Sequence, residues 1–72
     1  MKLLIFETNL DNTQKIAAVQ LLFNNHNSII DWHVDMQDVD NVLRIEAKDN
    51  MEEVDVINLM ATEGFYCGDL VG

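Results

Sequence analysis

The spacing of apolar residues switches repeatedly between a strand period and a helix period along this chain, and the order of those switches limits the fold more than any single motif. Successive side chains of a strand alternate between two faces, whereas those of a helix return to one face every three to four residues. This rule divides the 72 residues into a predicted strand, helix, strand, strand, helix and strand. The predicted ranges are 2–8, 11–25, 30–36, 42–48, 50–64 and 65–71.

Each predicted helix has an apolar face and a polar start. The apolar face of the first helix comprises Ile16, Val19, Leu22 and Phe23, and that of the second comprises Val54, Ile57 and Met60. Asp11 with Gln14, and Asn50 with Glu53, have the spacing of capping boxes that begin a helix. Gly64 suits the position just after a helix, where the backbone turns left-handed.

The second and third predicted strands each have one apolar and one polar face. The inward residues of the second strand are Ile30, Trp32, Val34 and Met36, and those of the third are Leu43, Ile45 and Ala47. The outward set is Asp31, His33, Asp35, Val42, Arg44 and Glu46. The loop 37–41 between them is acidic and rich in turn-forming residues, which predicts a hairpin.

The element order predicts an α+β fold of the ferredoxin-like type over residues 1–72 as a single domain. This fold has a four-stranded antiparallel sheet in the order 4-1-3-2, with both helices on one face. Its geometry brings the loops 8–13, 37–41 and 64–66 to one end, while Ser28 and the turn 48–50 lie at the other. The second and fourth strands are then the two edges of the sheet.

Charge and cysteine content restrict the partners and the compartment. Thirteen acidic residues against four basic ones give a net charge of −9, which disfavours nucleic acid and anionic membrane surfaces because both bind through Lys and Arg. The single cysteine excludes an internal disulfide and is typical of a reducing compartment. The apolar run 3–6 is too short for a secretion signal or a membrane span. We therefore expect a cytoplasmic protein.

The chain resembles the heavy-metal-associated domains of copper chaperones and metal-transporting ATPases. The resemblance rests on four segments. They are residues 8–10 at the end of the first strand, Val19 and Phe23 in the first helix, the predicted hairpin strands at 32–36 and 42–45, and the glycine-aromatic turn 63–65. In that family the first loop carries a Cys-x-x-Cys metal motif. Asn12 and Lys15 occupy the two cysteine positions here. The resemblance thus implies a degenerate member that has the fold without the metal-binding motif.

Metal binding through other residues is the alternative function. Soft metals select thiolate ligands, so an atypical site would use Cys67 with nearby carboxylates. A buried cysteine that packs as a small apolar residue is the commoner case. The acidic residues at the loop end, Asp11, Asp35, Asp38, Asp40 and Glu63, lack the spacing of a calcium loop and predict a solvated rim.

The sequence favours a small non-catalytic binding or regulatory module with an unknown protein partner. No catalytic triad or Cys-His pair has supporting spacing, and no cofactor is expected. An anion site around Lys15 at the first helical turn is a third, weaker hypothesis. The predicted interaction loop comprises Thr8, Asn9, Asp11, Asn12, Lys15 and Phe65. The helix-free face of the sheet is a second candidate surface, and we expect a monomer or a weak homodimer.

Overall fold

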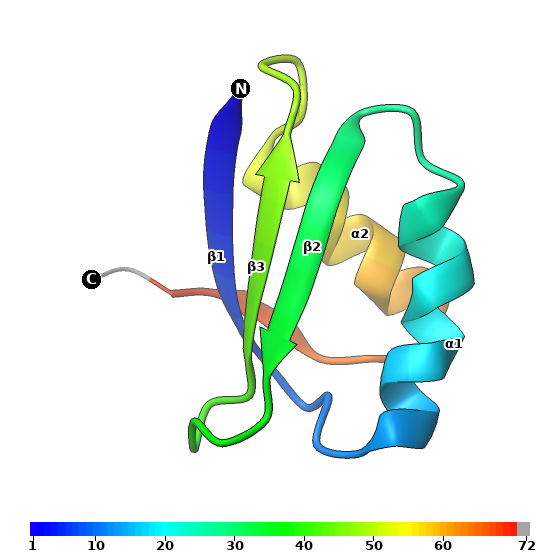
Figure 1. The fold of residues 1–72 in the computed structure, drawn as a ribbon, viewed down its shortest axis with the longest axis vertical. Coiled ribbons are helices and arrows are strands. Elements are labelled where there is room, and N and C mark those ends of the chain that lie inside the picture. Colours follow the sequence, from blue (N-terminus) through cyan, green and yellow to red (C-terminus); the bar gives the residue numbers. More distant parts are fainter. Residues whose placement is uncertain (71–72) are drawn as a thin grey trace.

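A computed structural model describes residues 1–70, and its elements follow the predicted order (Figure 1). They are β1 (Lys2–Thr8), α1 (Thr13–Asn24), β2 (Ile29–Asp35), β3 (Val42–Ala47), α2 (Glu53–Thr62) and β4 (Cys67–Asp69). The four strands form one sheet in the order β2-β3-β1-β4, which is the predicted order counted from the other edge. Every strand pairing is antiparallel. The ferredoxin-like α+β prediction is therefore confirmed.

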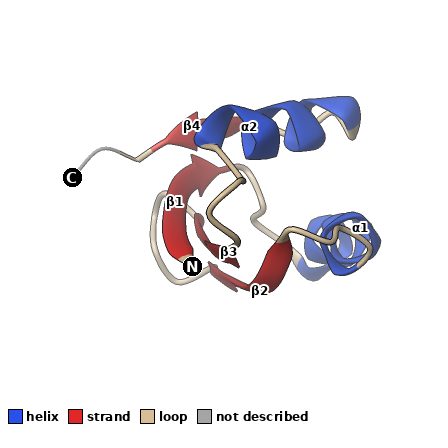
Figure 2. Ribbon diagram, turned by 90° about the horizontal axis from the view of Figure 1, so that it is seen from above, coloured by secondary structure: helices blue, strands red, loops and turns tan. Residues whose placement is uncertain are grey.

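The core lies between the sheet and the two helices. Viewed from above, the sheet curls, α2 lies beside β4 and α1 beside β2 (Figure 2). Fully buried side chains come from the sheet and from both helices, and the largest include Phe6, Leu43, Ile45, Phe23 and Val56. The alternation along β1, and along β3 from Leu43 onward, places one apolar face of the sheet against the helices, as predicted. Val42, which was predicted to face outward, is buried as well, so that prediction is wrong. None of the helices within residues 1–70 is long and apolar enough to cross a membrane.

Both predicted helix caps are wrong by one or two residues. The N-cap of α1 is Asn12, whose side-chain oxygen accepts a hydrogen bond from the backbone of Lys15 at 2.9 Å. Asp11 instead pairs with the Lys15 side chain. The N-cap of α2 is Glu52, whose backbone N–H donates to the Asp55 carboxylate at 2.9 Å, and Asn50 lies in the turn before it. At the other end Gly64 has φ +78°, which confirms its predicted role.

The buried face of α2 also differs from the prediction. Val56 and Met60 are fully buried, Ile57 is half-buried, and Val54 is 57% exposed. Val56 and Met60 lie four residues apart and share a face, whereas two residues along a helix point in nearly opposite directions. Because Val56 faces the core, Val54 faces solvent.

A β-bulge changes the exposure of β2. Ile29 pairs with Ala47 and Asp31 with Glu46, which leaves Ile30 without a partner and 54% exposed. A bulge of this kind inserts one residue and reverses the faces before it. Trp32 and Val34 keep the predicted inward side and are partly buried. Met36 follows the end of β2 and is 43% exposed, so its predicted burial is wrong as well.

Strand β4 is shorter than the predicted range 65–71. The backbone N–H of Phe65 donates to the Met60 carbonyl at 3.0 Å, and that of Tyr66 donates to the Asn9 side chain at 3.1 Å. These bonds belong to the connection from α2, so ladder pairing with β1 begins only at Cys67. The predicted strand residue Val71 lies outside the described residues.

The two valines of α2 provide a test of this helix orientation. We expect Val56→Ala to lower the free energy of unfolding by about 2 kcal/mol, because it removes two buried methyl groups and leaves a cavity. Val54→Ala is the matched control and should change it by less than about 0.5 kcal/mol. Urea unfolding followed by circular dichroism measures both. Equal losses in the two variants would contradict the orientation of α2.

Candidate functional site

The joint between β1 and α1 is held by hydrogen bonds to the β2–β3 hairpin. Thr8 is buried, its hydroxyl donates to the Asn41 carbonyl at 2.6 Å, and the same oxygen accepts from the Leu10 backbone at 3.1 Å. The Thr8 backbone N–H donates to the Asp40 carbonyl at 3.0 Å. These contacts confirm that the first loop and the hairpin share one end of the sheet, the lower end in Figure 1.

Asn9 joins the third loop to this end. Its side-chain oxygen accepts the Tyr66 backbone N–H at 3.1 Å, and its carbonyl accepts the Lys15 ammonium at 3.2 Å. Phe65, one residue before Tyr66, is partly buried and packs against the core. The predicted interaction loop is therefore assembled in space, and the side chain or backbone of each of its polar members has a bond within the protein.

Asn12 and Lys15, the two residues that the resemblance aligns with metal-binding cysteines, have structural roles. Asn12 caps α1, and the Lys15 ammonium lies 3.0 Å from the Asp11 carboxylate. The hydrogen bond from Lys15 is the main cause that lowers the pKa of Asp11. An exposed pair of this kind adds little stability, but it neutralises the one cation at the loop. Whether the loop also binds a partner stays a prediction.

Cys67 is a buried thiol at the start of β4. Burial, and then the charge of Asp69, raise its pKa to about 12. Metal binding and nucleophilic attack need the thiolate, which such a pKa disfavours at neutral pH. Within residues 1–70 no three His, Cys, Asp or Glu side chains are placed to hold a metal together. The outward His33 lies on β2, at the opposite edge of the sheet.

Two hairpin carboxylates are engaged in turns of the backbone. The Asp35 carboxylate accepts from the Gln37 backbone at 3.1 Å, and that of Asp38 accepts from the Asp40 backbone at 2.9 Å. Such side-chain bonds stabilise turns. These two residues of the predicted acidic rim therefore help to form the hairpin.

The face of the sheet without helices carries exposed apolar residues among charges. Leu3 is 58% exposed on β1, and Tyr66 is 54% exposed just before β4. The Tyr66 hydroxyl donates to the Glu7 carboxylate at 3.1 Å, and this bond is the main cause that raises the pKa of Tyr66. Gly68 makes the contact possible, because an added Cβ there would lie 2.5 Å from the Tyr66 hydroxyl.

A shallow depression lies on the same face of the sheet. It has a volume of about 260 Å³ and is bordered by residues of three strands, among them Leu3, His33, Arg44 and Glu46. His33 and Arg44 are cross-strand partners. Arg44 forms no ion pair with any residue in the range 1–70. The depression thus combines an apolar side chain with charged groups that face solvent.

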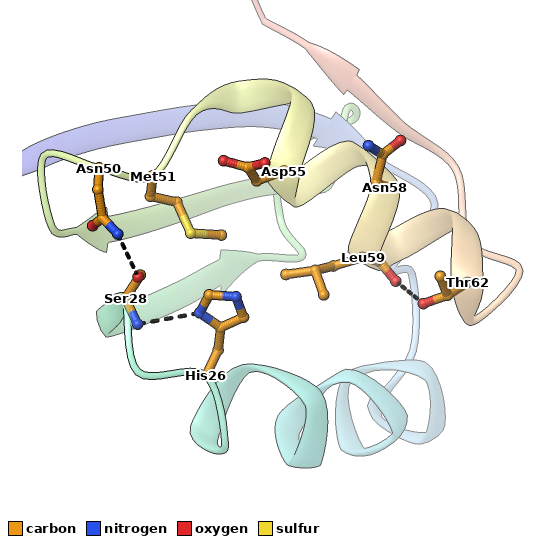
Figure 3. Close-up of a pocket in the computed structure, with 8 residues that line it drawn as sticks. All are labelled: His26, Ser28, Asn50, Met51, Asp55, Asn58, Leu59 and Thr62. Atoms are coloured by element: carbon orange, nitrogen blue, oxygen red, sulfur yellow. Dashed lines mark hydrogen bonds between the residues drawn. The ribbon is translucent and has the colours of Figure 1, made fainter.

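A larger cavity, about 380 Å³ and open to solvent, extends from the turn before α2 along that helix to Thr62 (Figure 3). Its lining includes His26 after α1, Met51 before α2, and Asp55 and Leu59 on α2. Sequence reasoning missed this site. The available indication was the predicted meeting of Ser28 with the turn 48–50, which is confirmed by a bond of 2.9 Å from the Lys48 backbone to the Ser28 carbonyl.

No protein-family model, curated protein or solved structure matches this chain.

Asn12 offers a test of its structural role. We expect Asn12→Ala to lower the free energy of unfolding by about 1 kcal/mol, because the Lys15 backbone N–H loses its capping oxygen. Asn27→Ala is the control, since Asn27 is exposed and forms no side-chain bond within residues 1–70. Chemical denaturation measures both variants. An Asn12→Ala variant as stable as the Asn27→Ala variant would exclude the cap.

Cys67 offers a second test, through pH. Between pH 9 and 10 the thiol of the unfolded chain loses its proton while the native thiol keeps it, so the native state binds more protons and stability falls as pH rises. The slope attributable to Cys67 approaches about 1.4 kcal/mol per pH unit. Cys67→Ala should lack this slope, and urea unfolding at pH 8, 9 and 10 in a reducing buffer measures it. Parallel pH profiles would show that the native thiol titrates normally.

Proposed function

We propose that this chain is a non-catalytic protein-binding domain that uses the helix-free face of its sheet to hold a basic, partly apolar segment of a partner protein. The observation that carries the proposal is the exposure of Leu3 and Tyr66 beside carboxylates on that face. Under this proposal the chain is a degenerate heavy-metal-associated-like domain. It acts in the cytoplasm as a monomer or weak homodimer, with neither cofactor nor nucleic acid.

The apolar part of the surface supports recognition of a protein segment. Leu3 and Ile5 point to the helix-free side of β1, because their neighbours Leu4 and Phe6 point into the core. Tyr66 reaches the same side through its bond to Glu7. Exposed aromatic and aliphatic side chains among polar ones are typical of interaction surfaces.

The charges of the same face support a basic partner. Asp31 and Glu46 are cross-strand partners with exposed side chains, and Glu7 lies on β1. Arg44 is the one Lys or Arg on β2 and β3. Together with the net charge of −9, these carboxylates attract cationic segments and raise their association rate.

The alternative, a metal-binding module built on Cys67, has weaker support. Its thiol is buried and has a raised pKa, and soft metals require the deprotonated sulfur. The anion hypothesis around Lys15 is also weak, because that ammonium contacts Asp11 at 3.0 Å. Neither residue presents the chemistry that its hypothesis needs.

The proposal is tested with a short peptide of alternating lysine and leucine, and with a glutamate–leucine peptide as the charge-reversed control. Amide shifts of the isotope-labelled protein report the binding site. We expect saturable shifts at Leu3, Ile5 and Arg44 with the lysine peptide only. Leu3→Ser should weaken binding about tenfold, because a buried leucine contributes roughly 1.5–3 kcal/mol.

Leu21→Ser is the matched control, since Leu21 is 71% exposed on α1, away from this face. It should leave the affinity unchanged within about twofold, because surface substitutions outside a site have small effects. Shifts confined to 8–15 would assign binding to the loop instead. An equal loss of peptide affinity in both variants, or a titration that does not saturate, would refute the sheet-face proposal. Sedimentation velocity separately tests whether the protein is a monomer or a weak homodimer.

A further inference from the structure

We propose that the cavity between α2 and the end of α1 binds a small organic cation with an apolar body. The cavity has a volume of about 380 Å³, within the range of roughly 300–1,000 Å³ that is usual for small-molecule sites. It is separate from the sheet face used by the proposed function, because the helices cover the other side of the sheet.

The apolar part of the cavity comes from Met51 and Leu59. Met51 is 2% exposed and belongs to the core, while Leu59 is half-buried and points from α2 into the cavity (Figure 3). Met side chains are flexible and fit ligands of varied shape. Leu59 therefore offers accessible apolar surface to the body of a ligand, whereas Met51 contributes little because it is almost fully buried.

His26 forms the opposite wall and is held in one orientation. Its Nδ1 atom accepts the Ser28 backbone N–H at 3.1 Å, so the hydrogen of the neutral ring is on Nε2. In Figure 3 the ring rises from the end of α1 toward α2. Ser28 in turn accepts a bond of 3.3 Å from the Asn50 side chain, which links the two loops that border the cavity.

Asp55 determines the charge of the ligand. One of its carboxylate oxygens, Oδ2, accepts the Glu52 backbone N–H, and no bond to the other oxygen occurs within residues 1–70. The eight lining residues include this carboxylate and neither Lys nor Arg. A cation is attracted by that carboxylate. An anion finds no Lys or Arg in the lining, and the net charge of −9 repels it.

Three probes of similar shape separate charge from apolar contact: 2-phenylethylammonium, 2-phenylethanol and 3-phenylpropionate. We expect the first to give saturable amide shifts at His26, Met51 and Leu59 when it is titrated into the intact labelled chain at neutral pH. The alcohol should bind about two- to fivefold more weakly, because it keeps the ring and lacks the charge. The carboxylate should show no saturation.

Two variants and one charge-matched control test the site itself. Asp55→Asn should weaken binding of the ammonium probe about two- to fivefold, because the Asp55 side chain is exposed and solvent screens its charge. Glu53→Gln removes the same charge from the same turn outside the lining and should leave binding unchanged. Thr62→Phe fills the rim and should abolish binding. It also keeps the test decisive if Asp55→Asn unfolds the helix start, where Asp55 accepts the Glu52 N–H.

The opposite results would overturn the proposal. Ammonium and alcohol probes of equal affinity would exclude a charge-selective site. Shifts spread over the acidic surface without saturation, or equal losses in Asp55→Asn and Glu53→Gln, would show attraction by net charge alone. Binding that survives Thr62→Phe would place the ligand outside the cavity.

Discussion

The hydrogen bonds of Thr8 and Asn9 hold together three loops that lie far apart in the sequence. Thr8 bonds the hairpin through both its backbone and its hydroxyl, and Asn9 bonds the connection from α2. Thr8 is the last residue of β1, a central strand of the sheet, and Asn9 comes directly after it. Because buried polar groups must be paired, this arrangement fixes the loop end of the fold. It also engages the groups that a ligand at this end would need.

Lys15 shows the same principle at the edge of this loop. The charge of its ammonium would repel a cation, and here it is directed to Asp11 and the Asn9 carbonyl. The side chains of this joint thus bond one another. Function is better sought on surfaces where side chains still face solvent, such as the sheet face around Leu3 and the cavity beside His26.

The order of elements could be predicted because hydrophobic period is a local property of the sequence. The N-cap of α1 could not be predicted, since Asp and Asn are almost equally good caps. In the structure Asn12 accepts the backbone N–H of Lys15, whereas Asp11 pairs with the Lys15 side chain. The bulge at Ile30 depends on pairing with β3, which no local pattern contains. The cavity could be predicted only in part: the meeting of Ser28 with the turn 48–50 follows from the fold, but the position of α2 relative to His26 does not.

Acidity unites the two proposed sites and also explains why apolar contacts must give them specificity. The side chains of Lys2 and Lys15 each pair with a carboxylate. Because acidic residues outnumber basic ones by 13 to 4, negative charge remains in excess at the surface and attracts any cation. Such attraction is long-ranged and screened by salt, and it cannot choose between a peptide and a small amine. Leu3 lies on a sheet face where an extended segment can contact several strands, whereas the hollow bordered by Leu59 and His26 has room only for a small ligand. The shape of each surface therefore selects the size of its ligand, whereas the excess negative charge selects only a positively charged one.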